Sequence, residues 1–171
     1  MRTDIADNIK NAIIKDYKEN GWLCVPEMQI GDLAYKLDSH KTNLPTASKH
    51  TETKSAFNMR PDIWLVNRNG KIIIVEVKSC RQDFTSDKKY HIYSNFCDLM
   101  YFAIDGDYIS KDELPKNVGL IKLDNSKRGF KFIKKAKSNN FSLDIETRCD
   151  FIFRLARSAS NRYLQKVFAN E

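Results

Sequence analysis

The stretch PDIWLVNRNGKIIIVEVKS, residues 61–79, constrains the fold more than any other part of the chain. Two apolar runs, rich in β-branched and aromatic residues, flank a short polar turn, which is typical of an antiparallel β-hairpin. A three-residue loop at 68–70 places Gly70 at the left-handed position that such loops prefer. This loop pairs Trp64 with Ile74 and so fixes the register of the two strands.

The same register brings two carboxylates together at one end of the hairpin. Side chains alternate between the faces of a strand, so Glu76 and Lys78 share a face. The three-residue loop sets Asp62 opposite Glu76, whereas a two-residue turn would set it opposite Val77 and on the wrong face. Directly opposed side chains have Cβ atoms about 4.5–5.5 Å apart, so the two acids repel unless a cation lies between them.

Two acids and a lysine at the edge of a sheet suit the hydrolysis of a phosphodiester bond. A divalent ion coordinated by oxygen at about 2.0–2.6 Å can bridge Asp62 and Glu76. Such an ion lowers the pKa of a bound water, while Lys78 orients that water or stabilises the developing charge. The alternative is a solvated cluster of surface charges, but exposed charges would not require the apolar run before them.

Composition favours a single domain, 1–171, with a polyanionic partner. The 171 residues are 42% hydrophobic and 30% charged, which is enough to bury one core. The net charge of +7 suits a nucleic acid, although solubility alone also explains many basic proteins. The N-terminus lacks the apolar core of a signal peptide and no apolar run reaches the length of a membrane span, so we expect a cytoplasmic protein. The four cysteines and three histidines lack metal-ligand spacing, which argues against zinc.

Hydrophobic periodicity predicts an α/β fold in which helices flank a central sheet. The expected elements are a helix containing residues 5–17, a strand at 22–30, the hairpin at 62–79, a short helix at 83–96, strands at 99–104, 118–123 and 129–134, and a long amphipathic helix at 143–168. Residues 36–59 are polar and lack periodicity, so we expect a long loop there.

The charged residues of the hairpin belong to a longer pattern. RPDIWLV…IIIVEVKS resembles the PD-(D/E)xK signature of restriction-endonuclease-like nucleases, and residues 75–104 resemble the MmcB-like family of bacterial DNA repair proteins. LPKNVGLI at 114–121 and FIFRLARSASNRY near the C-terminus fit the same family. The resemblance implies a restriction-endonuclease-like core (α-β-β-β-α-β) with a mixed sheet, an extra hairpin and a C-terminal helix. It also implies a Mg²⁺ or Mn²⁺ site and a repair role at the bacterial nucleoid, with DNA and other repair proteins as partners.

Carried over residue by residue, the resemblance makes Asp62, Glu76 and Lys78 the catalytic residues. The two acids, together with the backbone carbonyl of Val77, would hold the metal. Glu27 on the first strand is either a further ligand or a solvated strand residue. The predicted function is a metal-dependent nuclease of DNA repair, and the alternative is a non-catalytic DNA-binding module that keeps the nuclease fold.

Several basic residues are candidates for contacts with DNA. Lys89 and Tyr93 match the helix position where related exonucleases carry a Gln-x-x-x-Tyr motif, although lysine replaces that glutamine. Lys88 and Lys89 are either phosphate contacts or solvated lysines. The basic run at 127–137 supplies three secondary candidates, namely Lys131, Lys134 and Lys135.

Three further acids have structural roles as their first interpretation. Asp83 and Asp87 fall near the start of the helix predicted after Lys78, where a side-chain oxygen commonly satisfies free backbone N–H groups. Asp98 precedes the buried strand at 99–104, so we expect a turn or cap role rather than catalysis.

Overall fold

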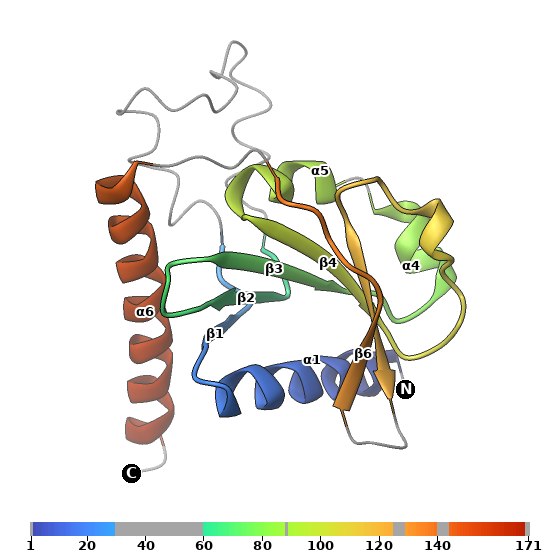
Figure 1. Cartoon of the computed structure of the whole chain (residues 1–171). Coiled ribbons are helices and arrows are strands. Elements are labelled where there is room, and N and C mark those ends of the chain that lie inside the picture. The colour runs from blue at the N-terminus through green and yellow to red at the C-terminus, as the bar shows by residue number, and fades with distance from the viewer. Residues whose placement is uncertain (1, 30–59, 88, 125–128, 140–143, 170–171) are drawn as a thin grey trace.

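A six-stranded sheet forms the centre of the molecule, as the sequence predicts. The computed structural model describes residues 2–29, 60–87, 89–124, 129–139 and 144–169 (Figure 1). The strands are β1 (Leu23–Pro26), β2 (Ile63–Val66), β3 (Ile72–Val77), β4 (Leu99–Ile104), β5 (Gly119–Asp124) and β6 (Gly129–Lys134). They lie side by side in chain order. Pairing is parallel between β3 and β4 and between β4 and β5, and antiparallel elsewhere, so the sheet is mixed.

Helices cover both faces of this sheet. They are α1 (Arg2–Glu19), α4 (Arg81–Ser86), α5 (Tyr90–Tyr93) and α6 (Ile145–Phe168), with short 3₁₀ turns η2 (Ser94–Phe96) and η3 (Lys111–Glu113). In Figure 1, α1 lies along one face and α5 along the other, while α6 stands beside the hairpin end of β2 and β3. The order of helices and strands agrees with the prediction.

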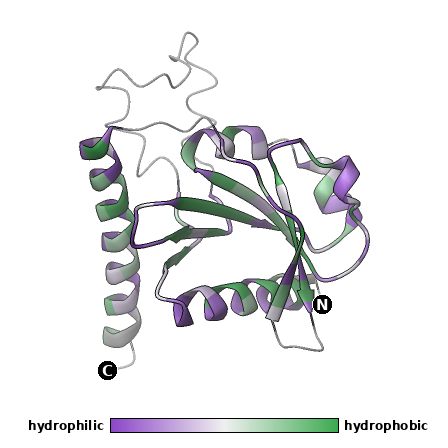
Figure 2. Cartoon of the chain, in the orientation of Figure 1, coloured by the Kyte–Doolittle hydropathy of each residue, from purple (hydrophilic) through white to green (hydrophobic). Residues whose placement is uncertain are grey.

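Alternation along the strands divides the buried apolar residues between the two faces of the sheet. On one face the odd-numbered residues of β3 pack against α1, whose Ile9 and Ile13 are buried. On the other face Ile72 and Ile74 belong to a second cluster that includes Phe151 of α6. Figure 2 shows the hydrophobic character of β3 and β4, which are buried between these layers.

The hairpin has the predicted register. Trp64 pairs with Ile74, and the Asn67 N–H donates to the Lys71 carbonyl at 3.1 Å. Gly70 has a φ of 74°, in the left-handed region that glycine adopts without strain. The three-residue loop is therefore confirmed, and with it the placement of Asp62 across from Glu76.

The strand predicted over 22–30 is shorter than expected. It ends at Pro26, which lacks an N–H to continue the pairing. Glu27 follows with a φ of 52°, a left-handed conformation that turns the chain out of the sheet. As an edge strand, β1 accommodates the proline, as the sequence indicated.

The helix predicted over 83–96 is also wrong in extent, because it is broken into pieces. α4 already begins at Arg81, and the break comes at Asp87, whose φ and ψ of −75° and 115° are extended. The carboxylate of Asp87 lies 2.5 Å from the ammonium of Lys78. The residue at the break is therefore tied by its side chain to the end of β3.

Some predictions fall on parts of the chain that are not described. The predicted loop at 36–59 and the side chain of Lys88 lie outside the described residues. Within the described ranges, no helix has both the length and the apolar character needed to cross a bilayer. The four cysteines are free thiols.

Candidate active site

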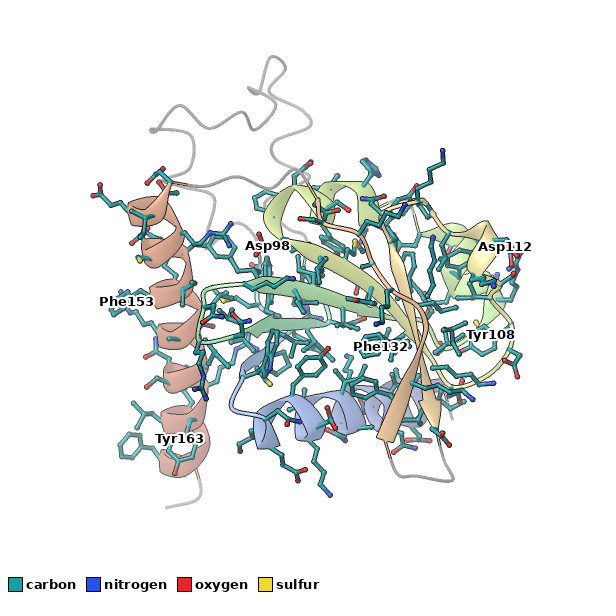
Figure 3. All side chains as sticks on the ribbon, in the orientation of Figure 1. Asp98, Tyr108, Asp112, Phe132, Phe153 and Tyr163 are labelled. Atoms are coloured by element: carbon teal, nitrogen blue, oxygen red, sulfur yellow. The ribbon has the colours of Figure 1, made fainter. Side chains whose placement is uncertain are left out.

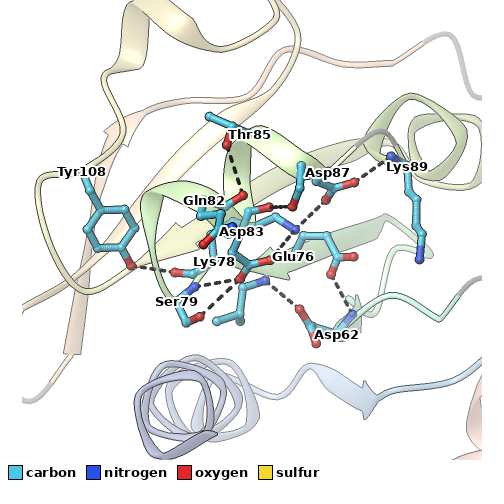
Figure 4. Close-up of polar contacts among 12 residues, drawn as sticks. Asp62, Glu76, Lys78, Ser79, Gln82, Asp83, Thr85, Asp87, Lys89 and Tyr108 are labelled. Atoms are coloured by element: carbon cyan, nitrogen blue, oxygen red, sulfur yellow. Dashed lines mark hydrogen bonds and ion pairs between the residues drawn. The ribbon is translucent and has the colours of Figure 1, made fainter. Parts of the chain in front are cut away.

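Asp62 and Glu76 meet where β2 begins and β3 ends (Figure 4). The Asp62 N–H donates to Glu76 Oε2 at 3.2 Å, and the Val77 N–H donates to Asp62 Oδ2 at 2.8 Å. Each acid is therefore oriented by a backbone N–H of the other strand. The carbonyl of Val77 faces the same side as its N–H, because both groups of a strand residue point to the same neighbouring strand.

Glu76 is held in an environment that disfavours its charge. Only 7% of the residue is exposed, and burial is the main cause that raises its pKa, to about 9. The negative charge of Asp62 and a hydrogen bond with that side chain raise the pKa further, whereas Lys78 lowers it. A buried carboxyl group next to a second carboxylate is a place where a cation would be strongly stabilising.

Lys78 is a buried lysine, 5% exposed, with its ammonium surrounded by acids. Its Nζ lies 2.5 Å from Asp87 Oδ2 and 3.9 Å from Asp83 Oδ1. Burial lowers the pKa of Lys78, but the hydrogen bond to Asp87 and the charges of Glu76, Asp87 and Asp83 raise it above its ordinary value. The side chain is therefore a fixed positive charge close to Glu76.

The two acids predicted as helix caps are partners of this lysine. Asp83 also accepts the N–H of Ser79 at 3.0 Å, just before α4, which is a role close to capping. Asp87 accepts the N–H of Lys89 at 2.6 Å, at the start of α5. Both acids therefore satisfy backbone N–H groups and hold the Lys78 ammonium at the same time.

A cavity of about 680 Å³ opens beside these groups. Its lining residues come from the ends of β3, α4 and α5 and from the chain that leads to and from β1 and β2, namely Gln29, Arg60, Glu76, Lys78, Asp83, Ser86, Asp87, Lys89 and Tyr93. Tyr93 is 2% exposed, and burial together with the neighbouring Glu76 carboxyl raises its pKa, so the phenol stays protonated. Lys89 is exposed at the mouth.

A lysine that the sequence did not single out bridges two of the acids. Lys10 of α1 places its Nζ 2.8 Å from Glu27 Oε1 and 3.1 Å from Asp62 Oδ1. Burial lowers the pKa of Lys10, but its two acidic partners raise it overall. The hydrogen bond from Lys10 lowers the pKa of Glu27. In sequence, Lys10 is a polar residue beside the apolar stripe of a helix, which does not separate it from solvated lysines.

Glu27 is held in its left-handed conformation by the far end of the chain. The Arg162 guanidinium of α6 donates to the carbonyls of Pro26 and of Glu27, the latter at 2.8 Å. A non-glycine residue with positive φ costs free energy and persists only where its surroundings hold it. In this conformation Glu27 lies close to Asp62, because its N–H donates to the Asp62 carbonyl. The carboxylate of Glu27 faces Lys10.

The donor set near Glu76 consists of oxygen atoms, which suit Mg²⁺ or Mn²⁺. Among the described residues no group of three or more His, Cys, Asp or Glu side chains is arranged to hold a metal ion. Asp62, Glu76 and the Val77 carbonyl form a smaller set. That set fits Mg²⁺, which commonly takes one or two protein carboxylates and keeps several waters.

The basic residues of β6 are not brought to this cavity. Two strands, β4 and β5, separate β6 from β3. Lys131 and Lys135 are exposed, whereas Lys134 donates to the carbonyls of Leu114 and Pro115 at 3.3 and 2.7 Å. A contact of these lysines with DNA stays a prediction, and the ammonium of Lys134 is already engaged by the backbone.

Asp98 has the structural role expected for it. Its carboxylate accepts the Ile72 N–H at 2.7 Å and pairs with Arg148 of α6, whose two terminal nitrogens lie 2.9 and 3.1 Å from it. Arg148 also donates to the carbonyl of Gly70 at 3.0 Å. These contacts join α6, the hairpin loop and the start of β4.

The comparisons with known proteins agree with this architecture. A family profile described as "MmcB-like: DNA repair protein MmcB-like" matches residues 43–170. The chain belongs to the MmcB-like family. The fold is similar to a solved structure titled "SPO1766 protein of unknown function from Silicibacter pomeroyi", with a TM-score of 0.65 and 19% sequence identity over 93% of this chain and 88% of that chain. The comparison with curated proteins gave no match.

Proposed function

We propose that this MmcB-like protein acts in DNA repair as a deoxyribonuclease that uses Mg²⁺ or Mn²⁺ to hydrolyse phosphodiester bonds. One observation carries the proposal: Glu76 and the buried Lys78 line one cavity, and the backbone N–H of Asp62 donates to the Glu76 carboxyl group. Buried like charges are costly, and perturbed ionisable groups in a cleft mark functional sites more often than structural ones.

In this proposal the carboxylates of Asp62 and Glu76 and the carbonyl of Val77 are the metal ligands. The bound ion would acidify a water molecule and neutralise charge that develops on the phosphate. Backbone N–H groups orient both acids before the ion arrives, which reduces the ordering that its binding requires. Tyr93, protonated and in contact with Glu76, restrains that side chain from the cavity side.

Lys78 has the second role, which is electrostatic. Asp87 and Asp83 keep its ammonium charged and in one position, so it can stabilise negative charge on the phosphate or orient the attacking water. Arg60 and Lys89 line the same cavity and would meet the DNA backbone there. The net charge of +7 favours approach of DNA from a distance.

Cleavage assays with matched variants test the proposal. The wild type should cut at least one of labelled single-stranded, duplex or flap DNA with Mn²⁺, and EDTA should abolish cutting. Glu76→Gln and Lys78→Met should each reduce the rate by roughly a hundredfold or more. Asp112→Asn, an exposed acid on η3, should keep the wild-type rate. A wild type that cuts none of these DNA forms with any divalent metal would refute the catalytic proposal.

A second function, DNA binding without cleavage, is favoured by the position of Lys10. Its single ammonium already pairs with both Asp62 and Glu27 without a metal. Under this function Glu76→Gln should bind fluorescent DNA with unchanged affinity, and no metal should alter binding. Binding that depends on Mn²⁺ and on Glu76 would count against it.

A further inference from the structure

The outer face of α6 is unusually apolar for a surface. Five large apolar side chains of this helix are exposed, namely Ile145 (83%), Phe153 (65%), Tyr163 (69%), Leu164 (43%) and Phe168 (65%). Figure 3 shows Phe153 and Tyr163 pointing away from the sheet. Monomeric proteins seldom expose a contiguous apolar patch of this kind unless it binds something.

These side chains lie on one side of the helix. We define the outer face by its exposed apolar residues, Ile145, Cys149, Phe153, Ala156, Tyr163, Leu164 and Phe168. At 3.6 residues per turn they fall within about 140° of the helix circumference. Phe151 and Leu155, which are buried against the sheet, lie on the opposite side. α6 is therefore apolar on two sides. Among the described residues, only the side that carries Phe151 and Leu155 is packed against the rest of the chain.

The spacing along the outer face matches the packing of two helices along their length. Cys149, Phe153, Ala156, Ser160 and Tyr163 are separated by four, three, four and three residues. This is the average spacing of 3.5 residues at which helices interlock over several turns. The middle of the series is small, so a second helix can approach closely there. The face therefore suits a helical partner better than an extended peptide.

The order of charges along the same side indicates the direction of that partner. Glu146 and Asp150 precede Arg157 on the margin of the outer face. Two copies of α6 in antiparallel orientation bring the same margins together and place Asp150 of each near Arg157 of the other, whereas parallel copies bring opposite margins together and do not form this pair. Asp150 also pairs with Arg154, one turn further along its own helix, at 2.8 Å.

We propose that two copies of this chain associate through the outer faces of α6, with the helices antiparallel. Phe153 of each copy lies over Ala156 of the other, and Ile145 meets Leu164. The exposed apolar side chains offer roughly 500 Å² per copy, so two copies reach about 1,000 Å², the lower limit of specific interfaces. No residue lining the described cavity belongs to α6, so association leaves that cavity open. The proposal does not depend on the proposed nuclease activity.

Sedimentation velocity over a range of concentrations tests the association in the full chain. The wild type should form dimers, and Phe153→Glu should raise the dimer dissociation constant by roughly tenfold or more. Ile133→Glu provides the control, because Ile133 is 39% exposed but lies on β6. Since Phe153 is exposed in the single chain, its variant should keep the wild-type unfolding temperature at low concentration.

Cysteine cross-linking tests the antiparallel arrangement. Phe153 over Ala156 puts Cys149 of one copy beside position 160 of the other, while the two Cys149 residues stay roughly 16 Å apart along the axis. Ser160→Cys should therefore give a covalent dimer on mild oxidation. The wild type, and Ser160→Cys combined with Cys149→Ser, should not.

Four results would overturn the proposal. The first is a wild type that stays monomeric at every concentration, and the second is a dimer unaffected by Phe153→Glu. The third is a dimer that cross-links through Cys149 alone, since that would mean parallel helices. A monomer whose unfolding temperature falls in Phe153→Glu would show instead that the chain covers this face itself, which also contradicts a second copy.

Discussion

Two acids near the two ends of β3, Asp98 and Glu76, lie in opposite electrostatic situations. At the first residue of the strand, Ile72, the carboxylate of Asp98 meets a backbone N–H and both terminal nitrogens of Arg148. At the other end, Glu76 lies next to Asp62, and its pKa is raised to about 9. Asp98 pairs through both carboxylate oxygens with the guanidinium of Arg148, whereas the nearest acid to Glu76 is a second carboxyl group, that of Asp62.

This difference separates an acid that holds the fold together from the acid to which we assign a chemical role in the proposed function. A bidentate pair between an arginine and a carboxylate is the arrangement in which both partners gain most. At Glu76, which is only 7% exposed, burial and the neighbouring Asp62 outweigh the positive charge of Lys78 and disfavour the charged form of the carboxyl group. Departures from favourable local interactions in an otherwise consistent fold are expected at functional sites.

The largest loss of stability should come from breaking the ion pair between Asp98 and Arg148. Arg148→Met leaves Asp98 partly buried without its guanidinium partner and removes the tie to the Gly70 carbonyl. We expect a loss of about 2–3 kcal/mol in the free energy of unfolding, measured by urea denaturation. Arg154→Met is the control, because its pair with Asp150 is more exposed and should contribute less than about 1 kcal/mol. Equal losses in both variants would remove the contrast between the two ends.

Neutralising Glu76 should instead increase the free energy of unfolding. The folded protein binds the Glu76 proton more tightly than the unfolded chain, whose pKa is near 4.5. The stability of the wild type should therefore fall as the pH rises from about 4.5 to about 9, and Glu76→Gln should remove that fall. At pH 8 we expect the variant to be more stable by about 1–3 kcal/mol, and at pH 4 equal to the wild type.

The same experiment tests the proposed binding of a divalent cation at Glu76. Mn²⁺ at pH 8 should raise the unfolding temperature of the wild type, because a ligand that binds the folded state stabilises it. It should leave Glu76→Gln nearly unchanged, and Asp112→Asn should respond like the wild type. A wild type whose stability does not vary with pH in this range would mean that Glu76 is already neutralised.

Removing Lys10 should lower the stability of the protein without metal and raise its affinity for Mn²⁺. Lys10→Met leaves Asp62 and Glu27 without the ammonium between them, so we expect a loss of about 1 kcal/mol without metal. The affinity for Mn²⁺, measured by calorimetry, should rise several-fold, because a positive charge next to a ligand oxygen has gone. Lys18→Met, at the other end of α1, should change neither quantity. A weaker affinity in Lys10→Met would mean that the lysine positions the acids for the ion.

The smallest effect should come from a tyrosine behind the site. The Tyr108 hydroxyl donates to the Lys78 carbonyl at 2.6 Å and lies 2.9 Å from Asp105 Oδ1. Tyr108→Phe should cost about 0.5 kcal/mol of stability. DNA cleavage should stay within a few-fold of the wild type, because the Lys78 ammonium keeps its own partners. A large loss of cleavage with little loss of stability would make Tyr108 a positioning residue.

The parts of the fold that local chemistry controls could be predicted from the sequence. The loop with Gly70 determines the register of β2 and β3, and the alternation along β3 then determines which face Glu76 and Lys78 share. β4 was predicted at 99–104 and is observed there, because a continuous apolar run of this length is a buried strand.

The parts of the fold and of the site that depend on contacts between distant residues could not be predicted from the sequence. Asp87, at the break between α4 and α5, pairs with Lys78, and the turn at Glu27 is held by Arg162, far away in the sequence. Lys10 reaches Asp62 only after α1 has packed under the sheet. Helical periodicity reports which side of a helix is apolar, but it carries no information on which polar neighbour finds a partner.

The grip of Arg162 on the Glu27 carbonyl has a consequence for how the protein is made. The two residues are 135 positions apart, so the exit of the first strand stays without this support until the ribosome has passed residue 162. Synthesis proceeds from the N-terminus and the early segments emerge first. The backbone turn that holds Glu27 next to Asp62 would thus form late, among the last steps in the folding of the nascent chain.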